Sequence, residues 1–119
     1  ELRQVPRHPL IQLGSHGWYH TEMGSIPIDE VTDELQRSRN YLRAIADREI
    51  TTLAWPSGSY SAVSVHTASA LGFKHQCAVD LIDKPDRERF PVLLSRYGVY
   101  DFPVSDRWLL HLIARGAHA

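Results

Sequence analysis

The sequence is short of three features that would point to particular classes of protein. Cys77 is the only cysteine among 119 residues, which excludes an intrachain disulfide framework. No block of lysines and arginines stands out and the formal net charge is −1, so nothing in the charge pattern points to nucleic acid or an anionic membrane. Apolar runs stay far below the ~20 residues that span a bilayer. We therefore expect neither a nucleic-acid partner nor a membrane span in this chain.

What is present is typical of one modest globular domain. Hydrophobic residues make up 43% and charged residues 23% of the chain. Apolar periodicity and turn residues predict an alternation of strands and helices, which indicates an α/β fold with parallel strands. The expected strands cover residues 11–13, 51–54, 75–79 and 92–95, and the expected helices cover residues 28–48, 61–71 and 108–115. The charges of the 28–48 helix, Glu34 among them, are interpreted as a solvated face.

Two histidines follow the first expected strand. His16 and His20 stand four residues apart in residues 14–20, Gly-Ser-His-Gly-Trp-Tyr-His. On a helical turn this spacing places both imidazoles on one face, where they can reach the same metal ion. A zinc site needs three or four such ligands. With seven histidines in the chain, surface or packing histidines are the alternative reading.

The other strand ends also carry polar or unusual residues. Trp55 and Tyr60 flank the turn after the second strand, Asp80 follows the third, and Arg96 follows the fourth. Parallel strands end at one edge of a sheet, so these residues are expected to lie together. Trp55, Tyr60 and Arg96 are candidate substrate-binding residues. The Trp55 indole can stack on a sugar ring or pack beneath the edge.

The motifs resemble those of one family. Residues 14–20 resemble the second motif of polysaccharide deacetylases, the NodB homology domain of carbohydrate esterase family 4. Residues 53–60, Leu-Ala-Trp-Pro-Ser-Gly-Ser-Tyr, resemble its third motif, in the variant that reads Phe-Ala-Tyr-Pro-Tyr-Gly. Residues 34–38 and 70–73 are similar to the helices of the family. The resemblance covers residues 10–100.

The resemblance implies a fold, a reaction and a set of site residues. The fold is a distorted (β/α) barrel of NodB type, and the reaction is the hydrolysis of N- or O-acetyl groups on an acetylated polysaccharide or oligosaccharide. Such an enzyme is a hydrolase acting on carbon–nitrogen bonds other than peptide bonds, and it uses a divalent metal, usually zinc. By this resemblance His16 and His20 are metal ligands. Pro56 and Ser57 line the acetyl pocket, with the Ser57 N–H directed at the oxyanion.

The chain departs from the family pattern at several positions. The family's first motif, Thr-Phe-Asp-Asp, supplies the catalytic base and a third metal ligand, but no Asp precedes His16 here. Gly17 stands where Ser or Thr is usual, Ser57 replaces Tyr, and Ala54 stands where many members carry Arg. Residues 109–111, Leu-Leu-His, have the form of the late motif that provides a general acid. His111 lies within an apolar helical pattern, however, which favours a helix residue over the acid.

Because the Thr-Phe-Asp-Asp motif is not in this sequence, we expect the chain to be only part of an active enzyme. We expect residues 1–119 to be one partial domain whose first barrel strands and Asp pair belong to upstream sequence, and the isolated chain to be nearly inactive. The open sheet edge beside residues 11–13 can then pair with a second copy of the chain. One alternative is a catalytically inactive, carbohydrate-binding or structural module of the same fold. Another is a zinc hydrolase that takes its third ligand from Asp80 or a partner chain.

Overall fold

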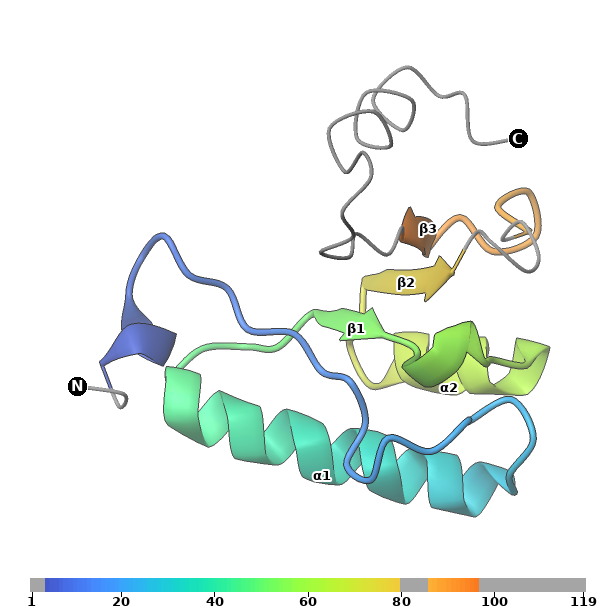
Figure 1. Cartoon of the computed structure of the whole chain (residues 1–119), viewed down its shortest axis with the longest axis horizontal. Coiled ribbons are helices and arrows are strands. Elements are labelled where there is room, and N and C mark those ends of the chain that lie inside the picture. Colours follow the sequence, from blue (N-terminus) through green and yellow to red (C-terminus); the bar gives the residue numbers. More distant parts are fainter. Residues whose placement is uncertain (1–3, 80–85, 97–119) are drawn as a thin grey trace, which may run out of the picture.

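The described part of the chain combines a small parallel sheet with two helices (Figure 1). The computed structural model describes residues 4–79 and 86–96. In chain order the elements are the 3-10 helix η1 (Val5–Arg7), α1 (Ile28–Ala46), β1 (Thr52–Ala54), the 3-10 helix η2 (Pro56–Gly58), α2 (Ala62–Ala70), β2 (His75–Val79) and β3 (Leu93–Arg96). The predicted helix over residues 108–115 lies outside the described residues.

The sheet has β2 at its centre, with β1 and β3 paired to it in parallel. Leu53 pairs with Gln76, which pairs in turn with Leu93, and all three side chains are fully buried. The strands predicted over residues 51–54, 75–79 and 92–95 are thus confirmed to within one residue at either end. Because the strands are parallel, their C-terminal ends meet at one edge of the sheet.

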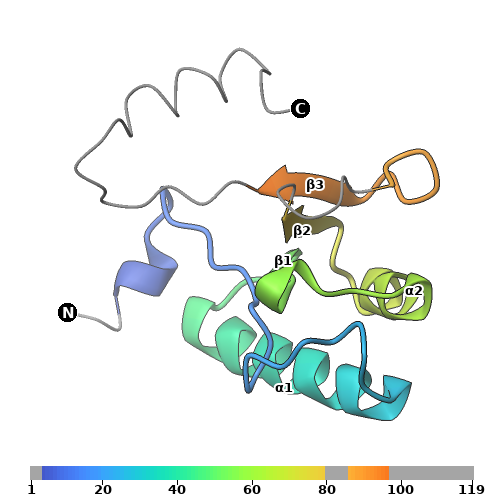
Figure 2. The same ribbon diagram turned by 45° about the vertical axis from the view of Figure 1, so that its right-hand side comes forward.

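The prediction of a strand over residues 11–13 is wrong. A single parallel bridge joins Ser15 to Leu53 instead, and Ser15 forms two backbone hydrogen bonds of 2.8 Å with β1. Two apolar residues, one on either side of Gln12, are too few to specify a ladder, and beyond Ser15 the φ of 75° at Gly17 turns the chain out of an extended path. The segment still runs beside β1 (Figure 1 and Figure 2), so it brings His16 to the C-terminal end of that strand.

Helix α1 buries one face that carries apolar residues at helical spacing. Val31, Leu35 and Ala46 are buried against the rest of the molecule. The helix was expected to reach residue 48 but ends at Ala46, because Asp47 adopts a left-handed conformation with φ 53°. The Asp47 N–H then donates to the carbonyl of Arg43, a common way for a helix to end.

Helix α2 confirms the prediction over residues 61–71. Ser61 and Ser64 form a capping box, in which each hydroxyl accepts a hydrogen bond from the other residue's N–H. Val65 and Ala68 are buried. Gly72, with φ 98°, follows the end of the helix.

One hydrophobic core joins the sheet to the two helices. Helices α1 and α2 contact each other and lie on the same side of β1 in both views (Figure 1 and Figure 2). The largest apolar side chains of this core are Trp55, Phe73, Met23, Leu35, Ile50, Leu53 and Leu93. Within the described ranges, no helix combines the length and the apolar character needed to cross a membrane.

Candidate functional site

His16 and His20 lie side by side in the loop of residues 14–20. Their ring centroids are 4.7 Å apart with the planes at 68°, and both residues are exposed. The helical turn expected here is wrong, because no residue of this loop is helical. The chain turns instead through positive φ angles at Gly17 (75°) and His20 (60°). The four-residue spacing predicted the proximity of the rings but not the backbone that produces it.

The orientation of His16 is set by a backbone carbonyl. Its Nδ1 lies 2.8 Å from the carbonyl oxygen of Ala54, at the end of β1. A carbonyl only accepts, so the neutral ring carries its proton on Nδ1 and keeps the lone pair of Nε2. Metal-binding histidines typically have this second hydrogen bond, which fixes the tautomer and the ring plane.

The turn that contains η2 lies against the histidine loop at Gly17, where an added Cβ would be 3.5 Å from Cγ of Pro56. Pro56 is buried and Ser57 is exposed. The N–H of Gly58 donates to the carbonyl of Trp55, and the N–H of Ser59 donates to that of Pro56, both at 2.9 Å. Neither bond uses the Ser57 N–H. Ser57 itself has a φ of 54°, an unfavourable conformation for a residue with a side chain and one that is often found at active sites.

The backbone carbonyls of two neighbouring residues, Ala54 and Trp55, accept hydrogen bonds from side chains of two different segments. Ala54 accepts the hydrogen bond from His16, and the carbonyl of Trp55 accepts one of 2.7 Å from Nη2 of Arg96. A loop before β1 and the end of β3 therefore meet at the end of β1. The prediction that these residues share one edge of the sheet is confirmed for His16 and Arg96. Asp80 lies outside the described residues.

Burial decides between the two readings of Trp55, in favour of packing beneath the edge of the sheet. Trp55 is fully buried, so its indole belongs to the core and is not free to stack on a sugar ring. Tyr60 is partly buried, with its ring centroid 6.3 Å from that of Trp55. The exposed aromatic residues nearest in sequence to the histidines are Trp18 (41% exposed) and Tyr19 (70%).

The histidine pair could supply two ligands of a metal site. His16 and His20 place two imidazole rings together, and imidazole nitrogens suit zinc and similar divalent ions. Among residues 4–79 and 86–96, no three His, Cys, Asp or Glu side chains come together to hold a metal ion. Asp80 and His111 fall outside these ranges. Since zinc takes three or four ligands, a zinc ion bound by this pair would need at least one further ligand from elsewhere.

Sequence reasoning missed the residues that hold the histidine loop. Glu34 was interpreted as part of a solvated face, which is wrong, because it is only 5% exposed. Its carboxylate accepts hydrogen bonds from the backbone N–H groups of Trp18 and Tyr19. The signal was available, since Glu34 and Ser38 follow the buried Val31 by three and seven residues and so share its helix face.

Comparison with known families identifies this arrangement. The profile of the polysaccharide deacetylase family matches residues 1–75, which is more than half of the chain. The chain belongs to the polysaccharide deacetylase family. The matched range contains the loop of residues 14–20 and the turn of residues 55–60, the two places where the deacetylase motifs were recognised. No curated protein matches the chain.

Solved structures show the same deacetylase fold. A deacetylase from Streptococcus pyogenes in complex with acetate is 21% identical, with a TM-score of 0.67, and the match covers 82% of this chain and 42% of that one. A de-N-acetylase from Aggregatibacter actinomycetemcomitans is 16% identical, with a TM-score of 0.60, covering 80% and 45%. A pseudoenzyme of carbohydrate esterase family 4 from Bacillus anthracis is 27% identical, with a TM-score of 0.51, covering 53% and 22%. The chain thus spans less than half the length of each of these proteins.

Proposed function

We propose that this chain carries part of the active site of a metal-dependent hydrolase that removes N- or O-acetyl groups from a polysaccharide or oligosaccharide. The observation that carries the proposal is the paired His16 and His20, with Nδ1 of His16 held by Ala54 beside the turn at Pro56 and Ser57. Membership of the polysaccharide deacetylase family supports the reaction class. Zinc is the metal that this donor set suits best.

Each residue of the site has a role in this proposal. His16 and His20 would hold the divalent metal, which when bound supplies Lewis-acid polarisation of the acetyl carbonyl and of the attacking water. Pro56 is fully buried, so it would shape the acetyl pocket by fixing the turn behind it. The N–H of Ser57 donates to the developing oxyanion, an interaction that stabilises the transition state more than the substrate.

Arg96 supports the site from β3. Its guanidinium donates to the carbonyl of Trp55 and so holds the turn that presents Ser57. Tyr60, partly exposed at the other end of this turn, is the remaining candidate for a substrate contact. His111 stays a candidate general acid on sequence grounds alone.

The general base and a third metal ligand are proposed to come from sequence upstream of this chain. No Asp precedes His16, whereas the resemblance implies an Asp pair in the family's first motif. Residues 1–119 would then form one part of a larger (β/α) barrel. Within residues 4–79 and 86–96, one side of β1 carries only the Ser15 bridge, and there the earlier strands would pair or a second copy of the chain would bind.

A second candidate function is a catalytically inactive module that binds carbohydrate. The likeness to a Bacillus anthracis pseudoenzyme, at 27% identity, favours this alternative specifically. The two candidates predict different upstream sequences. An active enzyme needs carboxylates there, as the general base and as a metal ligand, whereas an inactive module can lack them.

Acetate release from acetylated oligosaccharides tests the proposed reaction. In the protein with its upstream sequence, we expect chelation to lower the rate by ~100-fold or more, because a metal contributes several kcal/mol to such reactions. Zinc should restore the rate. The 119-residue chain, which lacks the base, should be slower by ~10²–10⁴-fold.

The controls separate the two candidate functions. Acetate release that chelation leaves unchanged would contradict the metal-dependent mechanism. Binding of the oligosaccharide without any acetate release, in the presence of zinc, would favour the inactive module. A rate for the 119-residue chain equal to that of the longer protein would show that no upstream base is needed.

A further inference from the structure

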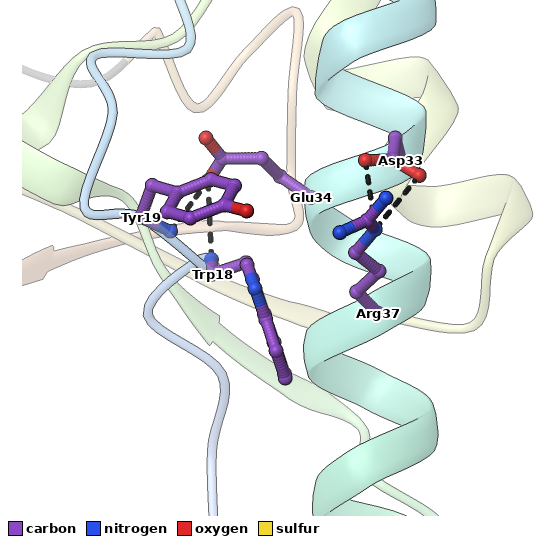
Figure 3. A network of polar contacts seen from close by, with 5 residues as sticks. All are labelled: Trp18, Tyr19, Asp33, Glu34 and Arg37. Atoms are coloured by element: carbon purple, nitrogen blue, oxygen red, sulfur yellow. Dashed lines mark hydrogen bonds and ion pairs between the residues drawn. The ribbon is translucent and has the colours of Figure 1, made fainter.

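Glu34 is a buried carboxylate placed directly under the histidine loop. Its Oε2 accepts hydrogen bonds from the N–H groups of Trp18 (3.1 Å) and Tyr19 (3.3 Å). Figure 3 shows its side chain extending from α1 toward these two backbone nitrogens. On the same helix, Asp33 and Arg37 form an exposed ion pair with each other. Glu34 therefore differs from its acidic neighbours in both burial and partners.

A second residue of α1 holds the loop on the other side of His16. The hydroxyls of Ser38 and Ser15 are hydrogen-bonded at 2.6 Å in a buried position. The Ser15 hydroxyl also accepts the N–H of Gly17 at 3.2 Å. One turn of α1 thus holds the loop on both sides of His16. Ser38 bonds the side chain of Ser15 before it, and Glu34 bonds the backbone of Trp18 and Tyr19 after it.

A buried carboxylate is costly unless it is well bonded. Hydrogen bonds to an ionised acceptor are stronger than neutral ones, and more so where water is excluded. Here both bonds of Glu34 go to the two residues between Gly17 and His20. These bonds therefore stabilise the conformation of the backbone that determines how far apart the two imidazoles lie.

We propose that Glu34 is a positioning residue that presets His16 and His20 for metal binding. The proposal rests on the proposed metal-dependent function and deepens it. A loop that already holds its ligands in place loses less conformational freedom when the ion binds. Removing the anchor should leave both ligands present but separately mobile, which weakens metal affinity.

Substitution of Glu34 tests this in the protein with its upstream sequence. Glu34→Gln keeps the size and one acceptor oxygen but loses the charge, whereas Glu34→Ala loses both. We expect the zinc Kd to rise ~10–100-fold in Glu34→Ala, as for other residues that support metal ligands, and by less in Glu34→Gln. Glu30→Gln, exposed one turn earlier on the same helix, is the matched control and should bind zinc as the wild type does.

A purely structural role for Glu34 predicts a different result. It would lower the unfolding temperature while leaving the zinc Kd and the absorption spectrum of bound Co²⁺ unchanged at temperatures where the variant is folded. We expect the Co²⁺ spectrum to change in both Glu34 variants and not in Glu30→Gln. If Glu34→Ala does not fold, Glu34→Gln decides the matter.

The outcomes for Glu34 and for the proposed function are distinguishable. Wild-type protein that binds zinc, together with folded Glu34 variants that bind it equally well with an unchanged Co²⁺ spectrum, would overturn the positioning role alone. Wild-type protein that binds no zinc would overturn the metal-dependent function and the positioning role with it.

Discussion

Replacing His16 with alanine is expected to abolish zinc binding and to lower deacetylase activity by about a thousand-fold. The reason is that His16 is one of only two paired imidazoles at the site, and its Nε2 is the nitrogen left free by the hydrogen bond to Ala54. Loss of a catalytic metal removes several kcal/mol of transition-state stabilisation, and ~1.4 kcal/mol corresponds to ten-fold in rate. Zinc titration and acetate release, measured in the protein with its upstream sequence, give the two values.

The control for His16→Ala is another exposed histidine. His75 begins β2, at the end of the sheet opposite the histidine pair, and is exposed. His75→Ala should retain zinc binding and activity. Full activity in His16→Ala would contradict the proposed role of the histidine pair, whereas equal losses in both variants would indicate a general effect on folding.

Replacing Gly17 with alanine is expected to destabilise the fold by about 2–5 kcal/mol and to disrupt the histidine loop. Gly17 has a φ of 75°, and a Cβ there would lie 2.7 Å from Cε of Met23 and 3.0 Å from Oε2 of Glu34. Backbone strain costs about 1–3 kcal/mol, and overpacking adds a similar amount. Because the contact is with the carboxylate that anchors the loop, zinc affinity should fall as well. Chemical denaturation and zinc titration measure the two effects.

Gly72 offers a matched control for Gly17. It has a φ of 98°, but a Cβ at this position would meet nothing within 4 Å. Gly72→Ala therefore carries the backbone strain without the steric contact, and it should leave zinc affinity unchanged. Equal losses of stability in the two variants would show that the contact with Met23 and Glu34 is unimportant.

The regular elements could be predicted from the sequence because their signals are local. The apolar periodicity of α1 and α2 and the apolar residues of β1 to β3 each lie within a few residues. The Ser15 segment could not be predicted, because its single bridge depends on β1, almost forty residues later in the chain. Apolar residues before a turn predict a strand only where a neighbouring strand pairs with them over several residues.

The site was predicted only in part, because some of its geometry depends on contacts between residues far apart in the sequence. The proximity of His16 and His20 was predicted from their spacing, and the position of Arg96 beside the end of β1 followed from parallel strand ends. The left-handed conformation of His20 and the burial of Trp55 could not be read from the residues. Glu34 was misread because a charged residue at a helix surface is usually solvated, and only the loop above it supplies the two N–H groups that make its burial favourable.

The most direct test of the account is the position of the metal. A crystal of the protein with its upstream sequence, grown with zinc and measured on both sides of the zinc absorption edge, would locate the ion by anomalous scattering. We expect one strong anomalous peak bonded to Nε2 of His16 and to a ring nitrogen of His20, each at ~2.0–2.1 Å. An ordered histidine pair in the same conformation with no anomalous peak between the rings, or a peak elsewhere in the molecule only, would contradict the account.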